Sequence, residues 1–394
     1  MIRTCTCRAL LVLLGALVCA TPARAADRPP EPVRKLVATE GKGYLETVDG
    51  YRVLHLKGTP EEMGLQHGRL LKASIAEGVA TMLTERPDDA ARLRIGDLST
   101  TRGTIAEVLR KAFADKAPEA YMKEMRALAE GAGLPPEKII ACNLIPEMFH
   151  CSGFALLAKT TADGKLYHGR VLDYGVGQGL QDQAVLILQE PDGKVPFANV
   201  SYAGFIGSVT GMNAAGVSVG EMGGGGTGLW NGIPMAFLMR MALEDAHSLQ
   251  EAIDVFRKNP RTCEYYYVLA DARADKAVGL WATPDKLDLI GPGQAHPLLP
   301  TPIADTVILS AGDRYKKLVE RVREGVGKFT PESALRLMDG PVAMGSNLHD
   351  VLMIPADGVL YVANAGKDGS PAWKQKYYRL DVRRLMAERP KAGE

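Results

Sequence analysis

The sequence lacks the compositional signatures of several protein classes. Its 394 residues carry 47 Lys and Arg against 46 Asp and Glu, so neither sign is in excess to attract nucleic acid or an anionic membrane. Aromatic residues make up only 6%, and six cysteines are too few for a disulfide scaffold. No apolar run reaches the ~20 residues that cross a bilayer. Since 46% of the residues are hydrophobic, the composition is that of a globular protein with a sizeable core.

Several ligand-binding motifs are also missing. The seven histidines show no HExxH or similar spacing, so we expect no metal site. The glycine run at 223–226 is not followed by the Lys-Ser or Lys-Thr of a phosphate-binding loop. It reads instead as the rim of a pocket. We therefore expect no metal and no cofactor.

The first 25 residues have the pattern of a secretory signal. Arg3 and Arg8 precede an apolar run at 9–20, and a small-x-small cleavage site at 23–25 predicts a mature chain that begins at Ala26. A lipoprotein signal around Cys19 fits less well, because Val18 stands where a small residue is expected. The chain is therefore predicted to be secreted or periplasmic.

Removal of this signal leaves three cysteines, which are Cys142, Cys151 and Cys263. An oxidising compartment favours paired cysteines, and three cannot all pair within one chain. At least one is a candidate reactive thiol. A disulfide between Cys142 and Cys263 is left open by the sequence.

The pattern changes along the chain from helices to hairpins. Thr59 and Pro60 open a predicted helix as N-cap and first residue, and Gly64 and Gly68 on one face permit close packing of another element. A short extended piece at 47–58 precedes this helix. Further helices are expected near 104–116, 118–132 and 136–142, with no strand pattern of comparable strength before residue 150. This predicts a mainly helical segment over 26–150.

After residue 150, Asp-Gly and Asn turns separate apolar runs and predict successive hairpins. Helices return at 234–246, 249–258 and 312–325, between further strand pairs. Without a regular strand–helix–strand repeat, this order indicates an α+β fold with helices on antiparallel sheets. We expect 26–394 to form one structural domain.

Cys151 stands where the two patterns meet. A lone cysteine is usually a small buried apolar side chain. However, pairing of 152–159 with 165–172 would bring Arg170 and Asp173 to the same end of the sheet as Cys151. A guanidinium lowers the pKa of a thiol and favours the nucleophilic thiolate. A carboxylate three residues further on could hold an amine or orient the arginine.

These residues, together with PEEMGLQHGRLL at 60–71, GMNAAGVSV at 211–219 and the blocks at 234–253 and 265–283, resemble a known family. It is the acyl-coenzyme A:6-aminopenicillanic acid acyltransferase family of cysteine N-terminal-nucleophile hydrolases. More distantly, the chain is similar to penicillin V acylase and bile salt hydrolase. The resemblance implies a four-layer αββα sandwich with an N-terminal helical region.

The resemblance also implies self-cleavage between His150 and Cys151, through an N-to-S acyl shift and hydrolysis. The α chain 26–150 and the catalytic β chain 151–394 would stay associated. The free α-amine of Cys151 would be the base for its own thiol. Arg170 would polarise the thiol, Asp173 would bind the α-amine, and Asn213 would donate its amide to the oxyanion. From the residues alone, Asn213 is equally a turn residue that tolerates left-handed geometry.

The chain departs from the family at the second oxyanion asparagine, which aligns with 262–264 where no Asn occurs. Glu264 would donate there only if protonated, and Asn347 is the other candidate donor. His349 reads equally as a core or turn residue. The run beginning at Arg314 is interpreted as a solvated helix face.

The leading hypothesis is an exported, self-processing amidohydrolase or acyltransferase that forms a thioester on Cys151 from a small amide or acyl donor. A non-catalytic periplasmic binding protein on the same fold is one alternative. A conventional cysteine peptidase with His150 or His168 as base is another. No nucleic-acid partner and no membrane span are expected.

Overall fold

Short β-branched and apolar runs separated by Gly and Asp turns fold into hairpins, because such turns supply the backbone geometry that reverses a strand. The computed structural model describes residues 31–84, 94–95, 98–99, 101–113, 115–144, 150–177, 179–225 and 228–390. The chain divides into a leader unit, residues 1–32, and the unit Val33–Glu394, which holds all the elements below. The predicted signal segment therefore lies outside the described residues.

The larger sheet has ten strands in the order β1-β2-β3-β8-β9-β10-β11-β12-β13-β14. Every neighbouring pair is antiparallel except β3 and β8, which are parallel. Its strands are β1 (Arg34–Glu40), β2 (Gly43–Val48), β3 (Tyr51–Gly58), β8 (Ala184–Pro191), β9 (Phe197–Tyr202), β10 (Thr210–Asn213), β11 (Val217–Gly223), β12 (Tyr265–Asp271), β13 (Lys276–Ala282) and β14 (Leu287–Ile290).

The smaller sheet has six antiparallel strands in the order β15-β6-β7-β16-β17-β18. They are β6 (His150–Leu156), β7 (Tyr167–Asp173), β15 (Thr306–Leu309), β16 (Asn347–Ile354), β17 (Val359–Asn364) and β18 (Tyr378–Asp381). A separate two-stranded ribbon pairs β4 (Arg94–Ile95) with β5 (Leu98–Ser99).

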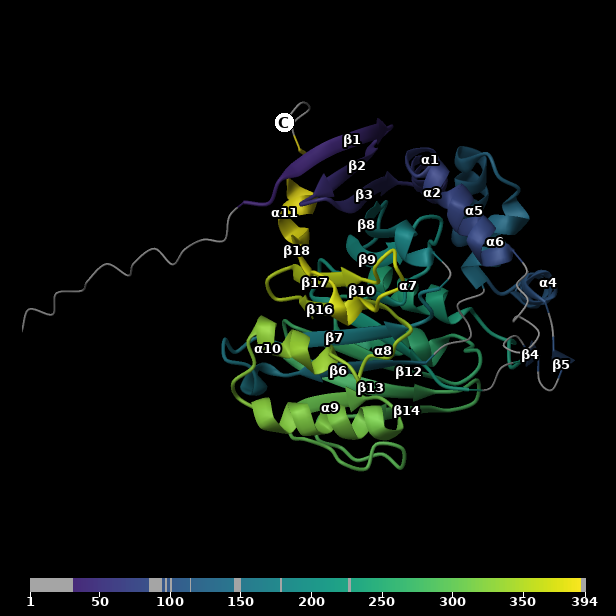
Figure 1. The fold of residues 1–394 in the computed structure, drawn as a ribbon. Coiled ribbons are helices and arrows are strands. Elements are labelled where there is room, and N and C mark those ends of the chain that lie inside the picture. Colours follow the sequence, from purple (N-terminus) through teal and green to yellow (C-terminus); the bar gives the residue numbers. More distant parts are fainter. Residues whose placement is uncertain are drawn as a thin grey trace, which may run out of the picture. The chain divides into compact units, whose positions relative to one another are not determined.

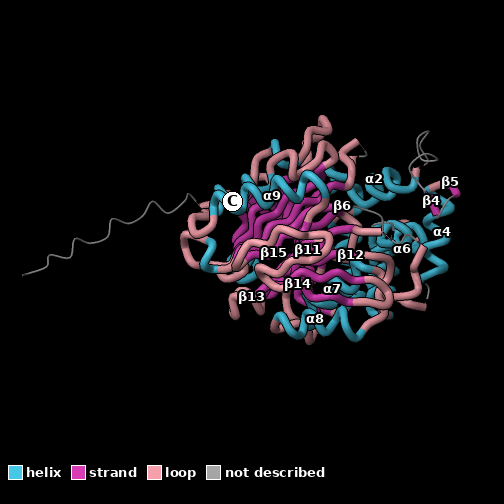
Figure 2. The backbone as a smooth tube through the Cα atoms, turned by 90° about the horizontal axis from the view of Figure 1, so that it is seen from below, coloured by secondary structure: helices cyan, strands magenta, loops and turns pink. Residues whose placement is uncertain are grey.

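The two larger sheets face each other, with β11 and β12 of one against β6 and β7 of the other. The helices α7 (Met235–Asp245) and α8 (Leu249–Lys258) cover the outer face of the ten-stranded sheet. On the other side, α9 (Gly312–Gly325) and α10 (Pro331–Leu335) cover the six-stranded sheet, and α11 (Val382–Ala387) packs on β17 and β18. Figure 2 shows the strands between α9 on one side and α7 and α8 on the other. The predicted α+β fold, an αββα sandwich, is confirmed.

The predicted N-terminal helices are present as α1 (Pro60–Leu70), α2 (Lys72–Leu83), α4 (Arg102–Phe113), α5 (Glu119–Ala132) and α6 (Pro136–Leu144). Figure 1 shows them grouped beside the end of the ten-stranded sheet. Thr59 caps α1, and its side chain accepts from the amide of Glu62. A Cβ on Gly64 would lie 2.3 Å from the carbonyl oxygen of Glu124 in α5. The predicted close packing at this glycine face is therefore confirmed.

The expectation of no strong strand pattern before residue 150 is wrong. The strands β1 to β3 form a meander, and Asp49 and Gly50, both at positive φ, make the turn between β2 and β3. β3 then pairs in parallel with β8, which follows it by more than a hundred residues. Because this pairing is long-range, no local periodicity indicates it.

Candidate active site

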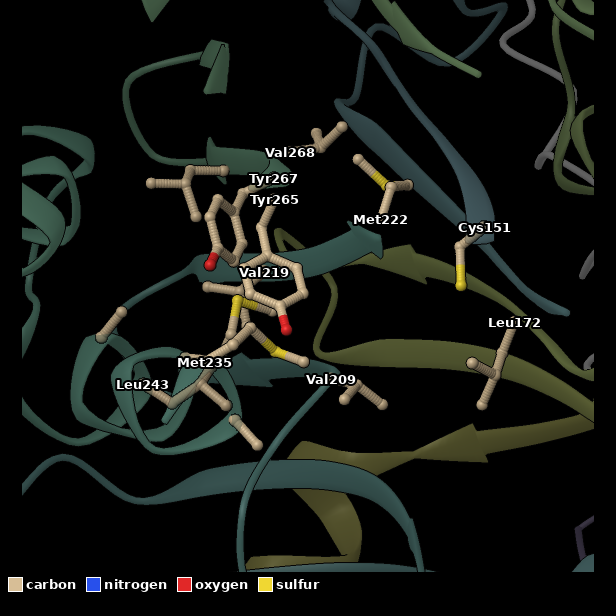
Figure 3. Close-up of a cluster of buried hydrophobic side chains, with 14 of the residues drawn as sticks. Cys151, Leu172, Val209, Val219, Met222, Met235, Leu243, Tyr265, Tyr267 and Val268 are labelled. Carbon is tan, nitrogen blue, oxygen red and sulfur yellow. The ribbon is translucent and has the colours of Figure 1, made fainter. Parts of the chain in front are cut away.

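The hairpin of β6 and β7 brings the predicted constellation together. In its register Cys151 pairs with Leu172, and Gly153 pairs with Arg170. Arg170 Nη2 lies 3.2 Å from Cys151 Sγ and donates to it. Cys151 is only 5% exposed, and Figure 3 shows its side chain beside Leu172 at the margin of a buried apolar cluster. The predicted proximity of Arg170 to Cys151 is thus confirmed by geometry.

Arg170 is completely buried between the two sheets, where an unpaired charge would be strongly unfavourable. Glu221 on β11 compensates it. Arg170 Nη2 lies 3.1 Å from Glu221 Oε2, and Arg170 Nε donates to the carbonyl oxygen of Glu221. Gly220 makes room for this arrangement, since a Cβ there would lie 3.0 Å from Arg170 Cγ. Sequence reasoning missed Glu221, although a carboxylate inside the apolar strand at 217–222 signals a buried partner.

The surroundings of Cys151 favour the neutral thiol over the thiolate. Burial raises its pKa to about 12, although Arg170 acts in the opposite direction, because the carboxylates of Glu221 and Asp173 also raise it. The expectation that Arg170 lowers the pKa is right for that single interaction and wrong for the sum. Desolvation disfavours the thiolate more than a guanidinium shared with Glu221 favours it.

Asp173 ends β7 next to the cut that the sequence predicts, since it pairs with His150 in the sheet. Its carboxylate accepts hydrogen bonds from the amide of Met344 at 2.9 Å and from the guanidinium of Arg314. Burial raises the pKa of this carboxyl, and Arg314 opposes that shift. These two donors therefore fix the orientation of the Asp173 carboxylate at the end of the hairpin.

The interpretation of Arg314 as part of a solvated helix face is wrong. It lies in the first turn of α9, where Nη2 donates to Ser152 Oγ at 2.7 Å and Nε donates to the carbonyl oxygen of Val342. Arg314 thereby joins Ser152, the residue after Cys151, to Asp173. The helix pattern alone did not reveal this, because β15 carries Arg314 to the site from far along the chain.

Asn213 is not brought to Cys151. Its amide nitrogen donates to the carbonyl oxygens of Leu243 and Ala246, and its side-chain oxygen accepts from the amides of Ala215 and Val217. The side chain thus fastens the β10–β11 turn to the end of α7. Met222, at the other end of β11, is the part of that strand that borders the cavity at Cys151. The predicted oxyanion role is corrected to the turn role.

Asn347 lies beside the site but is held in place. It pairs with Asp173 in the sheet, and its amide nitrogen donates to the carbonyl oxygen of Leu172 and to Asp350 Oδ1. Its side-chain oxygen accepts from the amide of Trp373. These bonds make Asn347 a support for the end of β7 rather than a free oxyanion donor.

His168 is buried on β7, four residues before Leu172, the strand partner of Cys151. Four residues span ~13 Å along a strand. Its Nδ1 shares a hydrogen bond with Ser218 Oγ at 2.8 Å, and burial lowers its pKa to about 3. His349 is also a core residue, bonded to Tyr202 and Thr210. The structure does not place His168 as a base for Cys151, and the side chain of His150 lies outside the described residues.

A cavity of about 460 Å³ opens at Cys151. Apolar side chains make up much of its wall, and Glu264 and Arg314 bring charge to it. Its lining consists of Cys151, Met222, Gly223, Gly224, Glu264, Tyr266, Leu298, Leu299, Leu309, Ser310, Ala311, Gly312, Arg314 and Met344. The glycines at 223–224 therefore do lie on the rim of a pocket.

The disulfide that the sequence left open is not formed. Cys142 and Cys263 are both buried, and neither forms a disulfide in the structure. Across the described parts of the chain, no group of three or more potential metal ligands comes together. No helix within those same parts is both long and apolar enough to cross a membrane.

A buried cysteine at the start of a strand in an αββα sandwich, contacted by an arginine and next to an aspartate at the end of the paired strand, is the arrangement that the sequence predicts around Cys151. The family model of acyl-coenzyme A:6-aminopenicillanic acid acyl-transferase matches residues 160–289. This match confirms the family resemblance predicted from the sequence. It also confirms the predicted enzyme class, an amide hydrolase or acyltransferase, at that general level.

Individual relatives are more distant. Protein dcd1B of Dictyostelium discoideum is 24% identical, with 91% of this chain and 80% of that protein covered. The N-acylethanolamine-hydrolyzing acid amidase of Mus musculus is 24% identical, with 50% of this chain and 55% of that protein covered. A solved structure of the Caenorhabditis elegans orthologue of that amidase aligns with a TM-score of 0.43 at 17% identity, over 58% of this chain and all of that one. The chain spans about half the length of most of the curated relatives it matches.

Proposed function

We propose that the protein is an exported, self-processing cysteine hydrolase that accepts the acyl group of a small amide or thioester on Cys151. The observation that carries this proposal is the contact of Arg170 with the Cys151 thiol, at 3.2 Å, because Cys151 also lines a cavity of about 460 Å³. The family match over 160–289 supports the same chemistry. Export rests on the signal pattern at 1–25.

Self-processing begins at the bond between His150 and Cys151. The thiol attacks the carbonyl carbon of His150, the C–N bond breaks as the amine takes the proton, and a thioester replaces the amide. Water then hydrolyses the thioester, which gives a new carboxylate on His150 and a free amine on Cys151. Asp173 pairs with His150 in the sheet, which supports its predicted role of holding the new ammonium group.

Cleavage also accounts for how a thiol with a raised pKa becomes a nucleophile. The new α-amine supplies a base within the same residue, and its charged form adds a cation beside the sulfur. No histidine is then required, which agrees with the distance of His168 along β7. This reasoning disfavours a conventional cysteine peptidase.

Catalysis follows the same steps with substrate in place of the chain. The Cys151 thiolate attacks the acyl carbonyl, the leaving amine takes a proton from the α-ammonium, and water resolves the thioester. Arg170 Nη1 is buried and has no hydrogen-bond partner among the described residues. We assign it as the donor to the oxyanion, a role usually worth roughly 10²–10³ in rate. Because coenzyme A is scarce outside the cytoplasm, the acyl group passes to water.

The test is capture of the acyl-enzyme. Purified wild type and Cys151→Ala are mixed with a short-chain acyl thioester, quenched in acid and weighed intact, and release of amine from matched acyl anilides is followed separately. We expect an acyl adduct on the fragment that begins at Cys151, removed by hydroxylamine and absent from the variant. A binding protein would give neither adduct nor amine. A histidine-dependent peptidase would form the adduct on an unprocessed chain and lose it in His168→Ala.

A further inference from the structure

Glu264 faces the same cavity as Cys151 but contacts neither Cys151 nor Arg170. It lies directly before β12, where Cys263 has a positive φ of 43° that turns the chain into the strand. The amide of Glu264 donates to the carbonyl oxygen of Gly225, which ties it to the glycine rim. The backbone on both sides therefore fixes the direction of this side chain toward the cavity.

Hydrogen bonds hold the carboxylate of Glu264 through one of its two oxygens. Trp281 Nε1 donates to Oε1 at 2.7 Å, and the Tyr266 hydroxyl donates to the same oxygen at 3.1 Å. Within the described part of the chain, every hydrogen bond to this carboxylate goes to Oε1. Gly224 and Gly225 leave space around it, since a Cβ on Gly225 would lie 3.2 Å from Oε2. The second oxygen is presented in a fixed position, as in a preorganised binding group.

Among the described lining residues, no cation is left over to neutralise this charge. Arg314 is the cation on the lining, and its guanidinium is already paired with Asp173. The other lining side chains are uncharged and mostly apolar, and Leu298 and Met344 among them are exposed. An ionised carboxylate accepts hydrogen bonds and has no proton to donate, so this arrangement suits the binding of a cation better than the oxyanion role predicted for Glu264 from the sequence.

We propose that Glu264 selects substrates that carry an ammonium or guanidinium group on an aliphatic arm. The arm lies along the apolar wall and the cation pairs with Oε2. This inference rests on the proposed function, because the cavity is taken to be the substrate site. The cation could belong to the acyl group or to the leaving amine, and the two sources are separable by experiment. A charge-assisted hydrogen bond in such a site favours the cationic substrate by roughly 10- to 100-fold.

The test uses two matched pairs of amides. In the first pair the cation is on the acyl group: 6-aminohexanoyl anilide is compared with heptanoyl anilide. In the second pair the cation is on the leaving amine: the heptanoyl amide of 1,5-diaminopentane is compared with the heptanoyl amide of hexylamine. We expect kcat/KM of the wild type to favour the cationic member of one pair by at least about tenfold, and Glu264→Gln to bring that ratio close to one. Gln keeps an acceptor for Trp281 and Tyr266, so the pocket is preserved. Glu320→Gln, on the exposed face of α9, makes the same charge change and should leave the ratio as it is.

The proposal is overturned if the wild type shows no cationic preference in either pair, or if Glu264→Gln leaves the preference in place. If none of the four amides is hydrolysed, the proposed function fails for these acyl groups. The preference of the cavity for a cation is then tested by chemical modification of Cys151, which needs no hydrolysis. Cationic, neutral and anionic methanethiosulfonates then modify Cys151, with the modified peptide identified by mass. Faster reaction of the cationic reagent that is lost in Glu264→Gln supports the proposal, and equal ratios in both proteins refute it.

Discussion

At the scale of single residues, the reactivity of Cys151 depends on how one guanidinium is shared. Arg170 contacts the thiol and Glu221 at almost equal distances, so its charge stabilises both. A completely buried charge also needs this partner, because loss of one member of a buried pair typically costs about 3–5 kcal/mol. The carboxylate that keeps Arg170 in place therefore also limits how far it activates the thiol.

Replacement of Glu221 by Gln should lower the pKa of the Cys151 thiol, because the carboxylate raises that pKa and the amide would not. Gln keeps the shape and an acceptor for Arg170. The measurement is the rate of iodoacetamide alkylation at the Cys151 peptide against pH. We expect the midpoint of the profile to fall by about one pH unit, the shift that corresponds to ~1.4 kcal/mol. A midpoint that stays or rises would contradict this electrostatic role, and Glu190→Gln on the surface is the control.

Asn213 offers a second test, between a turn residue and an oxyanion donor. Asn213→Ala removes hydrogen bonds at both ends of a buried amide, so we expect a loss of roughly 2–4 kcal/mol in the free energy of unfolding. The kcat/KM of the folded fraction should change less than about threefold, whereas a donor to the oxyanion is worth about 10²–10³. Denaturant unfolding and activity on the same sample separate the two readings.

At the scale of elements, the α1–α5 contact depends on glycines at the crossing. A Cβ on Gly64 would collide with backbone of α5, whereas one on Gly78 in α2 would meet its nearest atom, Gln183 Cγ, at 3.4 Å. We expect Gly64→Ala to destabilise the protein by about 1–3 kcal/mol through this overpacking. Gly78→Ala is the matched control and should be neutral or stabilising by up to about 1 kcal/mol. Equal unfolding midpoints for the two variants would refute the role of the crossing.

Elements that depend on nearby residues could be predicted from the sequence. The β6–β7 hairpin and the Thr59-capped helix follow from local turn and capping residues. The contact of Cys151 with Arg170 follows from the same hairpin. Glu221 and Arg314 reach the site through β11 and α9, whose positions depend on sheet pairing rather than local pattern. The sequence leaves Asn213 open between a turn residue and an oxyanion donor because both have the same sequence signal, and only its hydrogen-bond partners distinguish them.

At the scale of the whole molecule, buried histidines couple stability to pH. Burial lowers the pKa of His67 to about 3, and its Nε2 accepts from the amide of Gly204 at 2.9 Å. Since the folded pKa lies below the unfolded value near 6.5, the unfolded state binds the proton first as the pH falls. The stabilisation is present in full above pH 6.5 and is lost progressively from there toward pH 3.

We therefore expect His67→Gln to lose less stability than the wild type between pH 7 and pH 4. The difference should be up to about 3 kcal/mol, since each unit of pKa shift is worth ~1.4 kcal/mol. The measurement is the free energy of unfolding in denaturant at several pH values. Parallel curves for the two proteins would show that His67 does not contribute to the acid sensitivity.

The central claim is that Cys151 becomes the first residue of a second chain. Intact mass and a denaturing gel, with wild type beside Cys151→Ala purified from the exported fraction, test it most directly. We predict two wild-type fragments that begin at Ala26 and Cys151 and remain associated, and one uncut chain in the variant. A wild-type protein that stays a single chain and still hydrolyses amides would contradict it.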